Sequence, residues 1–122
     1  MIGKKVLICD DDEGILDMLS FILEDAGFDT ILEINSLNVN RVIEKEQPDL
    51  LLLDLWMPVL SGDQVLRMLK TNPETNKLPV IIISASMEGE KIATEAGADD
   101  FLAKPFDITQ LIDKVQELLG DS

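Results

Sequence analysis

Histidine and tyrosine are absent from this chain of 122 residues, and cysteine and tryptophan each occur once. Without histidine, no imidazole can act as a general acid or base, so histidine-dependent catalysis within the chain is excluded. The single cysteine, Cys9, allows no disulfide within the chain and has no partner for a catalytic pair, which fits a reducing compartment. Because Cys9 stands inside an apolar run, we expect it to be a small buried hydrophobic residue.

Basic residues are also scarce, with 10 against 24 acidic ones, a net charge of −14 and a pI near 4.1. This charge repels phosphate backbones, so we expect no direct binding of nucleic acid; it attracts cations and basic protein surfaces. No apolar run approaches about 18 residues, and the first residues lack an apolar stretch of signal-peptide length, so no membrane insertion is expected. The prediction is a cytoplasmic protein with one domain over residues 1–122.

Five short apolar runs alternate with five amphipathic stretches. Most of the runs are apolar on both faces, which is typical of parallel strands covered by helices. Five successive β-α units predict an α/β fold with a doubly wound parallel sheet and helices on both faces. The strands are expected at 6–9, 29–34 (an edge strand), 50–54, 80–83 and 100–103, and the helices at 14–26, 36–46, 63–70, 88–96 and 108–119.

Polar residues follow the predicted strands where each strand ends. Four leucines lead into Asp54, and the carboxyl ends of parallel strands share the edge at which α/β sheets bind ligands. Taken singly, these residues have ordinary explanations as helix caps, turn residues or solvated charges. Together they supply an acidic pair, a central acid, a hydroxyl and a lysine: Asp10 and Asp11, Asp54, Ser84, and Lys104.

The chemistry of this set is that of phosphoryl transfer. Carboxylates held within a few ångströms repel one another, and Mg²⁺ (or Mn²⁺) with oxygen ligands is the natural counter-charge. The Asp54 carboxylate can attack phosphorus, because carboxylates form aspartyl phosphates. The cation and Lys104 would neutralise charge on the transferring group, and the Ser84 hydroxyl can donate a hydrogen bond to it.

Four segments carry a family resemblance: VLICDDDE (6–13), LLLLDLWMP (50–58), VIIISAS (80–86) and AGADDFLAKPF (96–106). In order and spacing they resemble the receiver domain of response regulators in bacterial two-component and phosphorelay systems, over essentially the whole chain. The resemblance implies a flavodoxin-like fold with strand order 2-1-3-4-5. It also implies a phosphorylation-activated switch, not an enzyme beyond its own phosphorylation and dephosphorylation.

The resemblance assigns roles to single residues. Asp54 would be the phosphoacceptor, served by the phosphohistidine of a histidine kinase or a histidine phosphotransfer protein. Asp10 and Asp11 match the family's acidic pair, with Asp11 the more direct metal ligand. Asp54 and the backbone carbonyl of Trp56 would complete the ligand set for Mg²⁺.

The resemblance also implies how the switch works. Ser84 and Lys104 match the family's switch hydroxyl and lysine, the Lys104–Pro105 peptide bond would be cis, and Phe101 falls at the aromatic switch position. An output partner would bind the face formed by the fourth helix, fifth strand and fifth helix. The chain would be a monomer or a phosphorylation-dependent dimer.

This sequence departs from the family pattern in three ways. Phe101 lacks the hydroxyl of the tyrosine that many members carry, so a hydrogen-bonded version of the switch is absent. The interval from Ser84 to Gly97 is short, which suggests a trimmed loop or fourth helix. Trp56 is bulky: it either covers apolar surface at the rim of the site or shields an acyl phosphate from water.

Two alternatives from other classes remain open. Asp10 and Asp12 after the first strand superficially fit a haloacid-dehalogenase-like phosphatase with Asp10 as nucleophile, although Gly14 is unusual for that motif. A second alternative is a receiver that acts only as an unphosphorylated interaction module. The complete set of site residues argues against such degeneration.

Overall fold

Five parallel strands form the centre of the molecule in a computed structural model that describes residues 3–120. Their order across the sheet is β2-β1-β3-β4-β5, which confirms the expected doubly wound fold. Each neighbouring pair is parallel. The strands are β1 (Lys5–Cys9), β2 (Asp29–Glu33), β3 (Leu50–Asp54), β4 (Val80–Ser84) and β5 (Asp100–Ala103).

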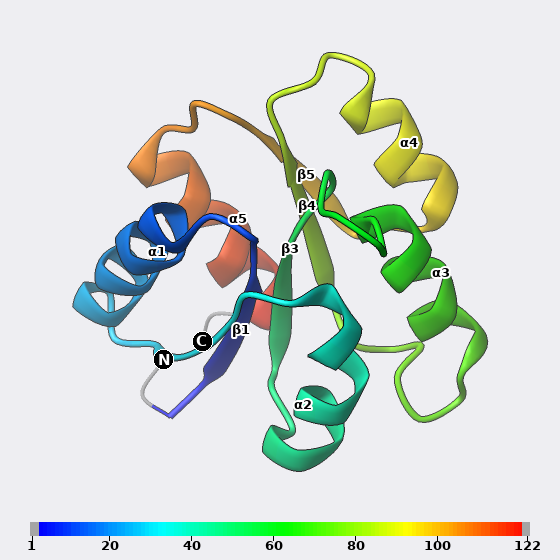
Figure 1. Ribbon diagram of the computed structural model, residues 1–122. Coiled ribbons are helices and arrows are strands. Elements are labelled where there is room, and N and C mark those ends of the chain that lie inside the picture. Colours follow the sequence, from blue (N-terminus) through cyan, green and yellow to red (C-terminus); the bar gives the residue numbers. More distant parts are fainter. Residues whose placement is uncertain (1–2, 121–122) are drawn as a thin grey trace.

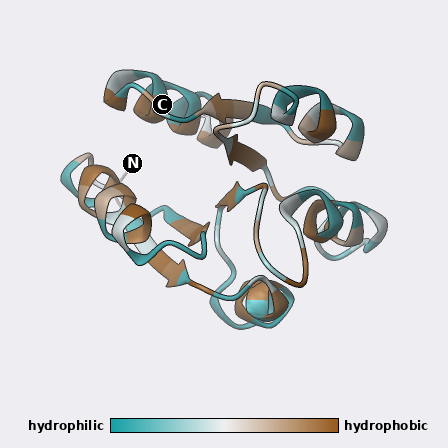
Figure 2. Ribbon diagram, turned by 45° about the horizontal axis from the view of Figure 1, so that its top comes forward, coloured by the Kyte–Doolittle hydropathy of each residue, from teal (hydrophilic) through white to brown (hydrophobic). Residues whose placement is uncertain are grey.

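Helices cover both faces of this sheet, as Figure 1 shows. Helices α1 and α5 pack on one face, and α2, α3 and α4 pack on the other. In Figure 2 the apolar colour gathers on the strands and on the helix surfaces turned toward them. The helices are α1 (Glu13–Asp25), α2 (Val39–Glu46), α3 (Gly62–Thr71), α4 (Gly89–Ala96) and α5 (Ile108–Leu119). None of the helices within residues 3–120 has the length and apolar character to cross a membrane.

The strands differ in burial according to their place in the sheet. Every residue of β3 and β4 is buried, because helices cover both of their faces. The edge strands β2 and β5 are only partly buried, and the alternating pattern of residues 29–34 predicted the edge position correctly. Cys9 is buried at the end of β1, as expected, and burial together with nearby Glu33 and Asp10 raises the pKa of its thiol to about 12.

The segment 36–46 differs from the single helix that its sequence pattern predicts. A 3₁₀ turn spans Ser36–Asn38, and the α-helix begins only at Val39. The Asn35 side chain accepts a hydrogen bond from the Leu37 backbone N–H, and the buried Ser36 hydroxyl donates to the Leu60 carbonyl at 2.7 Å. These contacts tie the first turn to the loop after β3 and tighten it.

Candidate functional site

Lys104 joins two buried carboxylates at the carboxyl edge of the sheet. Its Nζ donates to Asp10 Oδ2 and to Asp54 Oδ1, at 3.1 Å in both cases. The exposed fraction of the Asp10 side chain is 2% and that of Asp54 is 7%. The lysine lies 94 and 50 residues from these partners along the chain, so only the fold brings the three groups together.

Three carboxylates form a cluster around this contact. Asp10, Asp11 and Asp54 each offer an oxygen within 4.8 Å of the others, and Asp11 is the exposed member. Asp10 is fixed on both sides: its backbone N–H donates to Glu33 on β2, and its Oδ1 accepts from the Asp12 N–H at 2.9 Å. Asp54 ends β3, between β1 and β4. The expected acid pair and the central acid therefore meet.

The acidic run Asp10–Glu13 divides into two roles. Asp12 is the N-cap of α1, where its Oδ1 accepts from the backbone N–H of Gly14 at 2.8 Å and of Ile15 at 3.3 Å. Asp12 thus holds the start of α1, while Asp10 and Asp11 face Asp54.

Burial and like charge oppose ionisation of Asp54. Burial first, and then the Asp10 carboxylate, raise the pKa of Asp54 from 3.8 to about 6, although Lys104 acts in the opposite direction. Burial lowers the pKa of Lys104, but Asp54 and Asp10 outweigh it, so the net shift is upward and the ammonium stays charged. One lysine does not fully compensate the charge of the cluster.

Ser84 and Lys104 lie side by side at the same edge. The Lys104 backbone N–H donates to the Ser84 carbonyl at 2.9 Å, and the side chain of Ser84 is buried. Ser84 directly follows Ile83, whose carbonyl accepts from the Leu55 N–H next to Asp54. The Ser84 Oγ accepts from the backbone N–H of Ser86 at 3.0 Å.

The remaining expected residues surround this centre. Phe101 lies on β5 and is half-buried against the core that α2, α3 and α4 cover. The Lys104–Pro105 peptide bond is cis in the structure. Trp56, two residues beyond Asp54, is 51% exposed, which places its indole at the surface.

Two glycines that the sequence analysis did not single out pack closely against site residues. A Cβ at Gly62 would collide with the Asp54 carbonyl oxygen, and the Gly62 N–H donates to the Leu55 carbonyl at 2.7 Å. A Cβ at Gly89 would lie 2.8 Å from the Ser84 Oγ. The sequence signal was available only in part: Gly62 directly precedes the predicted helix 63–70, Gly89 is the second residue of the predicted helix 88–96, and each helix follows a strand that bears a site residue.

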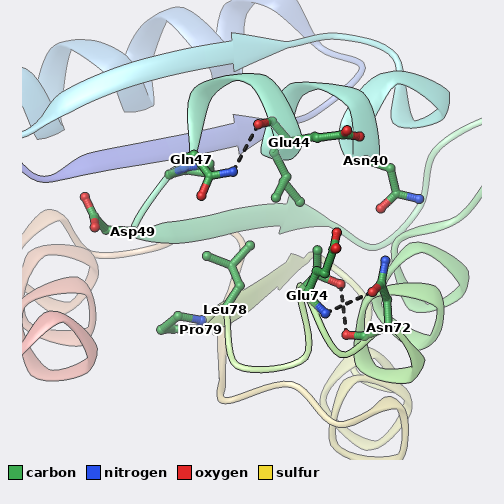
Figure 3. A pocket seen from close by; sticks show the side chains of 11 residues that line it. Asn40, Glu44, Gln47, Asp49, Asn72, Glu74, Leu78 and Pro79 are labelled. Atoms are coloured by element: carbon green, nitrogen blue, oxygen red, sulfur yellow. Dashed lines mark hydrogen bonds between the residues drawn. The ribbon is translucent and has the colours of Figure 1, made fainter.

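A separate polar hollow of about 460 Å³ lies at the other end of the strands (Figure 3). It opens between the end of α2 and the turn that precedes β4, with Asp49 and Pro79 at the starts of β3 and β4. Its side chains are tied into local turns: Gln47 Nε2 donates to the Glu44 carbonyl, and Asn72 Oδ1 accepts from the Glu74 N–H. No residue of the acid cluster lines this hollow.

An acid cluster with a lysine lies at the carboxyl edge of a parallel sheet in the order 2-1-3-4-5, the edge at which doubly wound α/β domains bind their ligands. The chain matches the model of the response regulator receiver domain over residues 6–116. It belongs to that family.

Known relatives agree with this assignment. The chain is 36% identical over 121 residues to sporulation initiation phosphotransferase F of Bacillus subtilis, covering 98% of this chain and 96% of that protein. It is 37% identical over 129 residues to the phosphate regulon transcriptional regulatory protein PhoB of Pseudomonas aeruginosa, which it covers over 56% of its length. It spans about half of other transcriptional regulators that it matches.

One similar solved structure is described with a bound metal ion. The receiver domain of sensor histidine kinase PA1611 from Pseudomonas aeruginosa, described with a magnesium ion coordinated in its active site cleft, matches with a TM-score of 0.89 and 26% identity. The match covers 98% of this chain and 99% of that one. In the present chain, three convergent carboxylates and the raised pKa of Asp54 fit a hard divalent cation bound through oxygen.

Proposed function

We propose that this chain is a phosphorylation-activated signalling switch in which Asp54 accepts a phosphoryl group from a phosphohistidine. The observation that carries the proposal is the contact of Lys104 with Asp54 inside the acid cluster. A buried carboxylate at a strand end, paired with a lysine and flanked by two further acids, suits a nucleophile whose attack adds negative charge to the site.

Each side chain has a defined task in this transfer. With a pKa of about 6, Asp54 is mostly ionised at neutral pH. Its oxygen forms a bond to phosphorus as the phosphorus–nitrogen bond of phosphohistidine breaks, and the imidazole keeps the electron pair. Lys104 and the Ser84 hydroxyl would hold oxygens of the arriving group. Mg²⁺ (or Mn²⁺), held by Asp10, Asp11, Asp54 and the Trp56 carbonyl, would neutralise the charge that builds up on the phosphoryl group.

Asp54 is a better candidate nucleophile than Asp10, the residue that a haloacid-dehalogenase-like phosphatase would use. Both oxygens of Asp10 accept hydrogen bonds, one from the Asp12 N–H and one from Lys104. In Asp54, Lys104 donates to Oδ1, and among residues 3–120 no side-chain hydrogen bond engages Oδ2. The geometry therefore favours the receiver reaction over the phosphatase.

An exposed apolar surface of this chain lies beside Lys104, where a phosphodonor protein would bind. A hollow of about 580 Å³ lies between α1 and the start of α5, and Phe21 on its wall is 75% exposed. No lysine or arginine occurs between Val6 and Asn40, so the charged side chains of α1 itself are all acidic, and Lys104 is the basic residue that lines the hollow. We propose that the donor presents an apolar, basic-flanked surface here. Phe21→Ala should then slow transfer from a phosphohistidine protein without slowing phosphorylation by acetyl phosphate.

Phosphorylation would change the surface that an output partner reads. Movement of Ser84 and Phe101 toward the phosphoryl group would shift a two-state equilibrium and alter the face formed by α4, β5 and α5. Within that face, Lys114 of α5 pairs with Asp100 of β5 at 2.9 Å, so a side-chain contact links the helix to the strand. The state of association in this proposal is a monomer or a phosphorylation-dependent dimer.

The test is the mass of the intact protein after incubation with acetyl phosphate and Mg²⁺. We expect one labile phosphoryl adduct on the parent protein and none on Asp54→Asn. Asp12→Asn is the matched control: asparagine caps helices as well as aspartate does, and Asp12 lies outside the acid cluster, so this variant should be phosphorylated like the parent.

The same measurement separates the alternatives. An adduct that persists in Asp54→Asn and disappears in Asp10→Asn would support the phosphatase and refute the receiver reaction. A parent protein without any adduct would support the unphosphorylated interaction module.

A further inference from the structure

We propose that Gly89 is a positioning residue for the reaction at Asp54: because it has no side chain, the first turn of α4 rests directly on Ser84 and holds the hydroxyl at the phosphoryl-binding edge. This inference deepens the proposed function and rests on it.

The contact is too close for any other residue. A Cβ at position 89 would lie 2.8 Å from both Cβ and Oγ of Ser84, and 3.2 Å from Cε1 of Phe101. Real Cβ atoms do not approach a neighbouring side chain to 2.8 Å, so Ser84 or α4 would have to shift. Gly89 is also buried, although the two residues before it are exposed. The backbone of α4 thus forms one wall around the hydroxyl.

The short loop after β4 explains why the first turn of α4 packs against Ser84. Only four residues separate Ser84 from Gly89, and Ser86 organises them. The Ser86 N–H donates to the Ser84 Oγ, the Ser86 carbonyl accepts from the Gly89 N–H at 3.1 Å, and the Ser86 Oγ accepts from the Glu88 N–H at 3.1 Å. This chain of bonds turns the backbone tightly and brings the start of α4 back onto the strand end.

The packing blocks one direction of movement for Ser84. Gly89 closes the side toward α4, so the Ser84 side chain cannot shift toward that helix. Since Phe101 touches the same position, α4, Ser84 and Phe101 meet at one point. A methyl group there would push the hydroxyl out of place or lift α4 from it.

The decisive variant is Gly89→Ala, tested by two readouts on the purified chain. We expect the rate of phosphorylation by acetyl phosphate to fall about tenfold, the effect of losing one hydrogen bond to the transferring group. The dissociation constant for Mg²⁺, measured by calorimetry, should stay within about twofold, because the acid cluster comes from the ends of β1 and β3, which residue 89 does not touch.

Gly97→Ala is the matched control at the other end of α4. Gly97 has a φ of 98°, so alanine is strained there, but its Cβ would meet only the side chain of Lys70, at 3.5 Å or more. This variant weakens α4 without touching Ser84, and its phosphorylation rate should equal that of the parent. Equal slowing in both variants would overturn the positioning role.

A further comparison remains informative if Gly89→Ala folds poorly. In a Ser84→Gly background the two closest atoms, Ser84 Cβ and Oγ, are gone and only the 3.2 Å approach to Phe101 remains, so adding Gly89→Ala should cost far less stability than it does in the parent. An equal cost in both backgrounds would overturn the inference. If the parent is phosphorylated and Gly89→Ala matches its rate, only the inference fails; if the parent takes no phosphoryl group at all, the proposed function fails too, and the inference fails with it.

Discussion

Strands β3 and β5 both carry residues of the site, but they differ in how the protein holds them. All five residues of β3 are buried, whereas β5 buries only Leu102 fully. Asp54 therefore stands on a strand covered on both faces and paired on both edges. Phe101 and the segment leading to Lys104 belong to the last strand of the sheet, which has one free edge.

The difference separates a fixed part of the site from a movable one. Local opening occurs most easily where few apolar groups are buried, and sheet edges are such places. A nucleophile gains from a fixed position, since small displacements slow a reaction strongly. A switch group must instead have a second position within reach. Mutation, pH and cation binding can each test this contrast.

Removing side-chain volume should cost far more in β3 than in β5. Leu52→Ala empties a fully buried position, and we expect it to lower the free energy of unfolding by about 2–5 kcal/mol. Phe101→Ala on β5 removes more atoms, but the position is only half-buried, so it should cost less, about 1–2 kcal/mol. Urea unfolding measures both values. Similar losses in the two variants would contradict the contrast.

Replacing an aspartate by asparagine should raise the free energy of unfolding on β3 and lower it on β5. Folding raises the pKa of Asp54 from 3.8 to about 6, so in this interval the native state binds more protons than the unfolded state, and stability falls as the pH rises. Without divalent cations, Asp54→Asn should therefore be more stable than the parent above about pH 7, by up to about 3 kcal/mol, and the gain should vanish near pH 4.

The matched acid on β5 is Asp100, which pairs with Lys114 at a partly exposed position. Asp100→Asn should lose about 0.5 kcal/mol at neutral pH, the usual value of such a pair. Urea unfolding at several pH values compares the variants. A destabilised Asp54→Asn at pH 7 would show that Lys104 outweighs burial and repulsion.

Magnesium should stabilise the protein through the central strands alone. At a hundredfold excess over its dissociation constant, Mg²⁺ should raise the free energy of unfolding by about 2.7 kcal/mol. The gain should be lost in Asp11→Asn and in Asp54→Asn, which remove cluster oxygens, and kept in Phe101→Leu. Thermal unfolding with and without the ion provides the measurement. Loss of the gain in Phe101→Leu would link the edge strand to the cation.

The smallest expected effect is on the rate at which water hydrolyses the acyl phosphate beside Trp56. If the indole of Trp56 shields the acyl phosphate, Trp56→Ala should lose its phosphoryl group several-fold faster, a barrier change of about 1 kcal/mol. Val59→Ala, in the same loop and 84% exposed, is the control and should match the parent. Dephosphorylation is followed by intact mass after acetyl phosphate is removed. A rate equal to or slower than that of the parent would assign Trp56 to the covering of apolar surface.

Patterns along the chain predicted the parts of this fold that depend on local sequence. Runs that are apolar on both faces correctly predicted β3 and β4. The alternation of apolar and polar residues correctly predicted that β2 lies at an edge of the sheet. The meeting of Asp10 and Asp54 followed from the common direction of parallel strands. What the sequence did not predict depends on contacts between distant segments. The tight first turn before α2 requires Ser36 to reach the Leu60 carbonyl, and the closeness of Gly89 to Ser84 appears only once α4 is docked.

Lys104 also determines what the protein can do before any ion arrives. The acid cluster carries three formal negative charges and the lysine one positive charge, which leaves a charge of minus two, equal and opposite to that of a single divalent ion. Because the lysine joins the two most buried acids, part of their mutual repulsion is offset within the fold itself. If the cluster binds a divalent cation as proposed, cation loading would be a reversible last step that follows folding.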